Sequence, residues 1–379
     1  MYLTRGSHFV GIAWVVALKA RRSSKRKRNG LLTKTTELKD SDYNIIQTLL
    51  DRKNSHYCPQ TFSDGDKVAL VIEGGGLSGA ITGGLVTAIH DLGLTESFDA
   101  IFASSSGVPA AAYLLAGTPE IGATIFPEDL VDGRFLNLKR LTKYYARKIG
   151  QEPPAMDLDY IFGILDGTGV RNDKTLDVNK VINSRVPLKI VVSDLDERRA
   201  KIIEGFKSRE EFLMYMRASC LVPGTAGRPI RDAKGHRLVD AKITRFNPVQ
   251  HALDEGYNKI LLLSPRPEGS RLWPKGVKGR LMDKMAIHLI RLVADSYHEG
   301  REFVRLAKDG ARINEAEVAA ATCDQRVMFL GLPSNHRRIL STEMNAKVLQ
   351  KAMLTAYKRA MNRLGNVVEP ATPELWATP

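Results

Sequence analysis

The sequence contains little cysteine and no long apolar run. Its 379 residues include only Cys58, Cys220 and Cys323, and their spacing matches no disulfide framework or metal-binding motif. We therefore expect a reducing, cytoplasmic location and neither a metal nor a cofactor. A membrane-spanning helix needs about 18 consecutive apolar residues, which no segment supplies. Hydrophobic residues at 43% and charged residues at 26% are typical of a globular protein with a sizeable core.

Acidic residues are absent from the first 30 positions, which hold eight lysines and arginines. The formal net charge is +14, and taking away these eight leaves +6. A short apolar run at 9–18 precedes most of the basic residues, whereas a secretory signal carries its charges before the apolar run. We expect residues 1–40 to form a basic tail or interfacial anchor that attaches the protein peripherally to anionic membrane surfaces. A disordered, solubilising leader is the alternative, and nucleic acid is not the expected partner.

A glycine-rich stretch, VALVIEGGGLSG, occupies residues 68–79. The run 68–72 predicts a buried strand, and 80–92 predicts a helix that begins with unpaired backbone N–H groups. Such a helix start binds anions. The spacing Gly74, Gly76, Gly79 is that of the dinucleotide fingerprint, but that use requires an acidic residue after the second strand. A loop that stabilises an oxyanion is the alternative use.

Three serines follow the second predicted strand, at 100–103, where the dinucleotide interpretation needs an acid. The segment 103–107, ASSSG, has the small residues of a GxSxG nucleophile elbow, with Ser105 at its centre and Ala103 in place of the first glycine. Such an elbow projects its serine from a strand-to-helix turn. A serine that only caps the helix at 107–116 is the structural alternative.

A nucleophilic serine needs a base. Asp240 follows a short apolar approach at 237–239 and is the leading candidate. The competing candidates are Asp194 and Asp196 after a predicted strand at 188–192, and His236 and His251, which flank Asp240 and keep a triad open.

The order of these elements predicts an α/β fold with a mostly parallel central sheet and helices on both faces. A further strand is expected at 259–263, and basic amphipathic helices at 280–308 and 341–364. The expected division of the chain is a tail or anchor at 1–40, a leader helix and loop at 41–67, a catalytic domain at 68–265 with an insertion at 118–185, a C-terminal helical extension at 266–365, and a tail at 366–379.

Three motifs stand in a specific order: EGGGLSG from 73, SSSG from 104 and VDA at 239–241. Together they resemble the patatin-like phospholipase family, in particular bacterial members that begin with EGGG. The segments 190–195 and 217–224 resemble intermediate landmarks of that family. The resemblance implies a three-layer α/β/α fold and a Ser–Asp dyad. It assigns Ser105 as the nucleophile and Asp240 as the base.

The same resemblance implies an oxyanion hole built from the N–H groups of Gly74, Gly75 and Gly76. The chain departs from the family pattern at Ala103, at Ala241 after the aspartate, and at Ser78, where the family usually has arginine. The expected function is a serine hydrolase of lipid carboxylic esters, of the phospholipase A type. A catalytically weak, lipid-binding or regulatory member of the family is one alternative, and a nucleotide-binding domain is the other.

Overall fold

The computed structural model describes residues 38–58, 63–140, 154–169, 172–245, 247–270, 289–365 and 373–376. They all belong to the larger of two compact units, Glu37–Pro379, and the smaller unit is Met1–Thr36. The predicted tail or anchor therefore lies almost wholly outside the described residues. Among the described residues, no helix combines the length and the apolar character that crossing a membrane requires.

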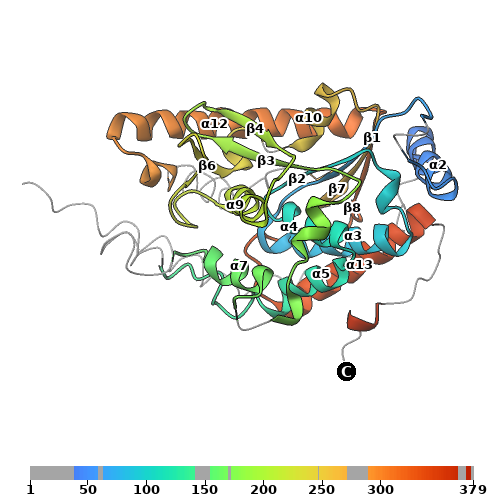
Figure 1. Ribbon diagram of the computed structural model, residues 1–379, viewed down its shortest axis with the longest axis horizontal. Helices are drawn as coiled ribbons and strands as arrows, with labels where there is room; N and C mark the ends of the chain where they lie inside the picture. Colours follow the sequence, from blue (N-terminus) through green and yellow to red (C-terminus); the bar gives the residue numbers. More distant parts are fainter. Residues whose placement is uncertain are drawn as a thin grey trace, which may run out of the picture. The chain divides into compact units, whose positions relative to one another are not determined.

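A twisted sheet forms the centre of the larger unit (Figure 1). Its order is β5-β6-β3-β2-β1-β7-β8, and β4 pairs with β3 outside this path. The pairs β3–β2, β2–β1, β1–β7 and β7–β8 are parallel, which confirms the predicted sheet. The strands are β1 Val68–Ile72, β2 Ala100–Ser104, β3 Leu188–Asp194, β4 Arg199–Ile203, β5 Ile230–Arg231, β6 Arg237–Asp240, β7 Lys259–Pro267 and β8 Val327–Leu332.

Helices cover both faces of this sheet, with α10 and α12 on one side and α3, α4, α5 and α13 on the other (Figure 1). The described helices are α2 Asp40–Asn54, α3 Gly79–Asp91, α4 Gly107–Ala116, α5 Pro119–Glu128, α7 Leu158–Asp166, α8 Val178–Ile182, α9 Arg209–Cys220, α10 Pro248–Asp254, α12 Tyr297–Cys323 and α13 Ala346–Gly365.

Strand β1 shows why the fold has three layers. Val68, Leu70 and Ile72 pack into the core formed with α3, α4 and α13. Ala69 and Val71 point to the opposite face, into a second core with residues of α10 and α12. Successive side chains of a strand alternate between faces, so a strand that is apolar on both sides must be covered on both sides. The three-layer α/β/α fold is thereby confirmed.

The C-terminal region differs from its prediction in two ways. The predicted helix at 280–308 is not continuous: the 3-10 turn η5 (Ile290–Val293) ends before an extended Ala294, and α12 begins at Tyr297. Ser296 is the N-cap of this new helix, because its Oγ accepts the N–H of Glu299. Residues 280–288 lie outside the described part. The region predicted as purely helical also supplies β8 to the sheet.

The remaining helix predictions agree with the structure more closely. The expected helix at 341–364 corresponds to α13, which begins later because Asn345 Oδ1 accepts the N–H of Val348. The insertion expected to be loose at 118–185 contains α5, α7 and α8. These helices matter for function because two of them line the pocket described below.

Candidate active site

Strand β3 lies between β2 and β6, and its pairing with both brings Ser105 and Asp240 to the same place in the sheet. Ser104 at the end of β2 lies beside Val191, and Asp240 at the end of β6 lies opposite Val192. Because Val191 and Val192 are consecutive, strands that are far apart in sequence place Ser105 and Asp240 side by side. The carboxyl ends of parallel strands are where α/β folds bind ligands.

Ser105 occupies a sharp turn between β2 and α4. Its φ is +51°, in the left-handed region that residues with a side chain rarely adopt. Its backbone N–H donates to Ser219 Oγ at 2.8 Å, and Ser219 donates in turn to the carbonyl of Val191 at 2.8 Å. Ser219 is fully buried. This contact stabilises a turn that would otherwise be strained.

Asp240 is 3% exposed and lies within hydrogen-bonding reach of the Ser105 hydroxyl. Burial raises the pKa of its carboxyl, and hydrogen bonds from the Lys242 N–H and from Ser105 partly oppose the rise. The Lys242 N–H lies 2.8 Å from Asp240 Oδ1. The neighbouring Cys220 thiol is also buried, and burial and the Asp240 charge raise its pKa. Asp240 is thus a carboxylate whose basicity exceeds that of an exposed aspartate.

The three consecutive serines have different surroundings. Ser104 is fully buried, and its Oγ has no hydrogen-bond partner among the described residues. Ser105 reaches Asp240 and lines the pocket. Ser106 Oγ accepts the N–H of Gly75 at 2.8 Å. Among the three serines, only Ser105 therefore combines a carboxylate neighbour with access to the pocket.

The glycine loop packs directly against the elbow. A Cβ on Gly74 would lie 2.5 Å from Ser105 Cβ, so only glycine fits there. Gly76 has a φ of +57° and lines the pocket. The N–H groups of Gly74 and Gly76 have no hydrogen-bond partner in the part of the chain that the structure describes, whereas the N–H of Gly75 is bonded to Ser106. The loop therefore carries free donors beside Ser105.

The departures from the family motifs leave the local geometry intact. Ala103 and Ala241 are fully buried, and neither is among the described residues with a positive φ. A methyl group at these positions therefore causes no backbone strain. Ser78 donates from its Oγ to the carbonyl of Gly75 at 2.7 Å, so it closes the glycine loop.

A buried ion pair fixes the start of the glycine loop. Glu73 is 1% exposed and pairs with Arg266 at 2.8 Å, while Ser264 donates to the same carboxylate at 2.6 Å. These groups connect the end of β1 to β7. A paired buried charge of this kind holds its neighbours in one arrangement because separating it is costly.

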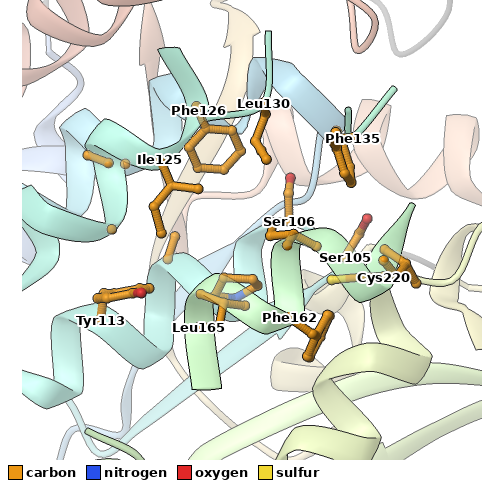
Figure 2. Close-up of a pocket in the computed structure, with 18 of the residues that line it drawn as sticks. Ser105, Ser106, Tyr113, Ile125, Phe126, Leu130, Phe135, Phe162, Leu165 and Cys220 are labelled. Atoms are coloured by element: carbon orange, nitrogen blue, oxygen red, sulfur yellow. The ribbon is translucent and has the colours of Figure 1, made fainter. Parts of the chain in front are cut away.

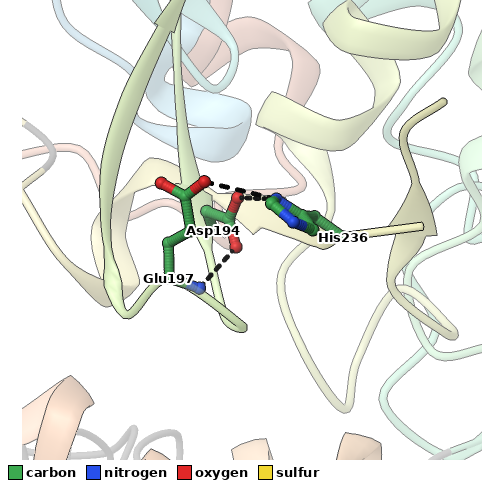
Figure 3. A group of neighbouring side chains, drawn as sticks. All are labelled: Asp194, Glu197 and His236. Carbon is green, nitrogen blue, oxygen red and sulfur yellow. Dashed lines mark hydrogen bonds and ion pairs between the residues drawn. The ribbon is translucent and has the colours of Figure 1, made fainter. Parts of the chain in front are cut away.

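The rival bases have other partners. Asp194 Oδ2 lies 2.9 Å from His236 Nδ1, and Glu197 Oε1 lies 3.5 Å from the same nitrogen (Figure 3). Ligand atoms of these three residues lie within 4.8 Å of one another, which is a spacing that could hold a cation. Lys201 Nζ lies only 3.8 Å from Asp194 and supplies positive charge there.

Two further rivals are likewise engaged elsewhere. Asp196 pairs with Arg237 at 2.6 Å, which helps to lower the pKa of Asp196. His251 lies on α10, where burial and the charge of Arg245 lower its pKa. Among the described residues, neither forms a hydrogen bond to Ser105. The structure thus brings Asp240, rather than the other candidates, to the serine.

An apolar pocket opens beside Ser105 (Figure 2). Helices α3, α4, α5 and α7 form much of its wall, and Ser105, Ser106 and Gly76 contribute its few polar groups. Along α4 the pocket reaches Tyr113, eight residues beyond Ser105 and thus about 12 Å along a helix axis. The other labelled wall residues are Ile125, Phe126, Leu130, Phe135, Phe162, Leu165 and Cys220.

Sequence reasoning missed several residues of this site. The role of Ser219 was not predicted, although the segment 217–224 was noted as a landmark. The contact between Ser106 and Gly75, and the position of Cys220 beside Asp240, also emerge only in the structure. The signal available for Ser219 was the resemblance of 217–224 to a family landmark, which did not indicate the role of its hydroxyl.

The chain is similar to one family of known proteins and to two solved structures. Residues 70–253 match the family model "Patatin-like phospholipase". VipD from Legionella pneumophila is similar in structure, with 13% identity, a TM-score of 0.41, and coverage of 79% of this chain and 67% of that chain. A structure of SpcU in complex with ExoU from Pseudomonas aeruginosa matches with 14% identity, a TM-score of 0.25, and coverage of 79% and 70%.

No curated protein matches the chain at a significant level. The family assignment therefore depends on the match over residues 70–253, which spans the glycine loop, the serine elbow and Asp240. Residues 70–253 therefore form a patatin-like phospholipase domain, as the ordered motifs predicted.

Proposed function

We propose that this protein is a serine acyl hydrolase that cleaves carboxylic esters of lipids, with Ser105 as the nucleophile and Asp240 as the base. The observation that carries the proposal is the position of the Ser105 hydroxyl, which lies at an apolar pocket within hydrogen-bonding reach of the buried Asp240 carboxylate. Membership of a lipid hydrolase family supports it.

In the first step, Asp240 removes the hydroxyl proton of Ser105 while Oγ attacks the ester carbonyl carbon. A new C–O bond forms, and the carbonyl electron pair moves to the oxygen. When the tetrahedral intermediate collapses, the alcohol or lysolipid leaves with the proton from Asp240. The raised pKa of Asp240 lies nearer to neutral pH than that of an exposed aspartate. A pKa near the working pH suits a group that must first accept a proton and then return it.

The oxyanion needs hydrogen-bond donors beside Ser105. The N–H groups of Gly74 and Gly76 have no other partner among the described residues, so we assign them as the donors. The sequence also predicts Gly75, but its N–H is bonded to Ser106, so its part in this proposal is to hold the loop in place. Removing one such donor in other hydrolases costs about 3–4 kcal/mol of transition-state stabilisation.

Water completes the cycle. Asp240 takes a proton from a water molecule, which attacks the acyl–Ser105 ester, and the fatty acid leaves as Ser105 regains its proton. No group beyond the dyad and the loop is required for these steps. Any negative charge that develops on the carbonyl is stabilised again by Gly74 and Gly76.

The pocket determines the class of substrate. Its apolar wall suits an acyl chain, because each buried CH₂ contributes about 0.8 kcal/mol of transfer free energy. We therefore propose phospholipids or related acyl lipids as substrates, with the acyl chain in the pocket and the remaining part of the lipid outside it.

The alternatives explain the site less well. A dinucleotide-binding domain needs an acidic residue at the end of β2 to bind the ribose hydroxyls, and Ser104 lies there instead. The pocket is lined mainly by apolar side chains, which do not hydrogen-bond a ribose. A catalytically weak member was suggested by Ala103 and Ala241, but both residues adopt negative φ values, and the serine and aspartate remain within reach of each other.

A fluorophosphonate probe tests the proposal. Wild type should be labelled, and Ser105→Ala should not. Ser104→Ala is a matched control, since this neighbouring hydroxyl is buried and has no partner among the described residues. Asp240→Asn should be labelled at least 100-fold more slowly. Labelling of Ser105→Ala at the wild-type rate, or no labelling of wild type, would overturn the proposal.

Hydrolysis assays extend the test to the substrate. Wild type and Ser105→Ala should be compared on phospholipids, lysolipids and triglycerides, with release of fatty acid as the measurement. Activity in wild type alone supports the proposal. Equal fatty-acid release by both proteins would contradict it.

A further inference from the structure

We propose that the loop at residues 333–345, between β8 and α13, is the surface by which the protein docks on anionic phospholipid membranes. This inference extends the proposed function, because it says how a lipid in a bilayer reaches Ser105. It concerns a part of the chain that neither the motifs nor the family model covers. The term edge loop is used below for residues 333–345.

The topology places the edge loop next to the catalytic elements. β8 is parallel to β7, which is parallel to β1, and β1 is parallel to β2. The loops after β1, β2 and β8 therefore leave the same edge of the sheet. These three are the glycine loop, the serine elbow and the edge loop.

A direct contact joins two of them. The N–H of Leu77 donates to the carbonyl of Ser341 at 3.0 Å. A Cβ on Gly76 would lie only 2.8 Å from that same oxygen. Since Gly76 also lines the pocket, the edge loop packs directly against a residue of the pocket wall.

The edge loop exposes apolar side chains at this place. Leu340 is 54% exposed and Met344 is 37% exposed, although Ile339 between them and β8 is buried. Large exposed apolar residues are few in the described part of the chain, and two of them lie within five positions here. Side chains of this kind insert readily at the level of lipid headgroups.

Basic residues accompany them. The edge loop contains Arg337 and Arg338 and a single acid, Glu343. The Arg337 side chain is 69% exposed and pairs with Glu343 at 2.8 Å. A guanidinium has five N–H donors, so donors remain for a lipid phosphate. Each arginine near an anionic surface contributes about 1 kcal/mol of attraction.

Both ends of the edge loop are fixed, so docking there would present the active site in a constant orientation. β8 lies in the sheet, and α13 packs closely on α3, where a Cβ on Gly84 would lie 2.3 Å from the carbonyl of Met353. α3 itself begins directly after the glycine loop. A bilayer contact at Leu340 would therefore hold the glycine loop, and with it Ser105, near the membrane surface.

Tryptophan fluorescence gives a local test in the full-length chain. Leu340→Trp and Leu375→Trp are each made together with Ser105→Ala, which prevents hydrolysis of the vesicles. Leu375 is the matched control because it is also 54% exposed but lies outside the edge loop. With mixed phosphatidylglycerol and phosphatidylcholine vesicles, brominated acyl chains should quench additional emission from Trp at 340 and not at 375. No additional quenching at 340, or equal quenching at both, would overturn the proposal.

A second measurement separates docking from chemistry. The double variant Leu340→Glu with Met344→Glu should hydrolyse vesicle phospholipid at least 10-fold more slowly, while the rate of fluorophosphonate labelling stays within twofold of wild type. Leu375→Glu should change neither rate. Unchanged vesicle hydrolysis in the double variant would overturn the docking surface. If wild type failed to react with the probe, the proposed function would fall, whereas the quenching result would still decide the docking surface.

Discussion

Ser219 lies directly behind Ser105, and its hydroxyl accepts the backbone N–H of that serine at 2.8 Å. The same hydroxyl donates to the carbonyl of Val191 on β3. The end of α9 thereby connects the serine elbow to the strand that also pairs with Asp240. The positive φ of Ser105 is thus supported by a residue that lies 114 positions later in the chain.

Ser219→Ala should reduce activity more than it reduces stability. The variant leaves the N–H of Ser105 without its acceptor, which costs about 1–3 kcal/mol, and it frees the elbow to relax from its positive φ. We expect kcat to fall at least 10-fold with little change in KM. Steady-state kinetics on a soluble ester, together with urea unfolding, measure both effects.

Ser193→Ala is the control for this prediction. Ser193 is also fully buried and hydrogen-bonded, to Thr244 at 2.8 Å, but it does not contact Ser105. It should lose similar stability and keep its kcat. A fall in kcat that is equal in the two variants would show that Ser219 has only a structural role.

The pH dependence of the reaction should reflect Asp240. Burial raises the pKa of this carboxyl, and only the deprotonated form accepts the serine proton. We therefore expect kcat/KM to decline as the pH falls, with a midpoint above about 3.9, the ordinary value for aspartate. Rates on a soluble ester across the acidic range check this, with circular dichroism to exclude unfolding. A midpoint at or below the ordinary value would contradict the assignment.

Asp240→Asn should be inactive and at least as stable as wild type at pH 7. A folded-state pKa above the unfolded value means that the native carboxylate is destabilising once the pH exceeds the folded pKa. Asparagine avoids this cost and still offers an oxygen to the Lys242 N–H. Going down in pH, the difference in unfolding free energy between the variant and wild type should shrink as Asp240 becomes protonated. A clear loss of stability at pH 7 would contradict this account.

Gly74→Ala should abolish activity. The added Cβ would lie 2.5 Å from Ser105 Cβ and 2.7 Å from the carbonyl oxygen of Ser104, so the elbow or the loop must move. We expect kcat/KM to fall at least 100-fold. Gly300→Ala is the matched control, because its nearest neighbour would lie 3.5 Å away and alanine favours a helix by up to about 1 kcal/mol. Activity retained in Gly74→Ala would show that the close contact is not required.

Ala110→Phe should shift the preference for acyl chain length. Ala110 lies on α4 and lines the pocket, so a phenyl ring there takes space from an acyl chain. We expect hydrolysis of a long-chain ester to fall at least 10-fold, while hydrolysis of an acetate ester changes less than threefold. Parallel assays on the two esters measure the shift. An equal fall on both would place the acyl chain elsewhere.

The fold could be predicted from the sequence where local patterns suffice. The apolar run before Gly74 and the run before Ser104 each form the predicted strand, because buried parallel strands are continuously apolar. The helix at 280–308 was predicted incorrectly because its apolar spacing continues through Ser296, whose side chain starts a new helix. β8 was missed because a short strand between two long helices is difficult to distinguish from helix by pattern alone.

The site was predictable only in part, for a related reason. The candidates Ser105 and Asp240 stand in motifs, and the structure brings them together through β3. Whether they act as a dyad stays a prediction that the labelling experiment tests. Ser219 stands in a segment that resembles a family landmark, and Ser341 carries no motif, but the role of each depends on which strands and loops are neighbours in the fold. Such neighbours follow from tertiary packing, which spacing along the chain does not encode.

Part of the pocket wall comes from a different stretch of the chain than the reacting groups. The serine, the aspartate and the glycine loop stand on strand ends, while α5 and α7 belong to the insertion after α4. Under the proposed function, mutation in that insertion should therefore alter which lipids are accepted without moving Ser105, Asp240 or the glycine loop. In evolutionary terms, substrate range and chemical competence are separable traits in this architecture.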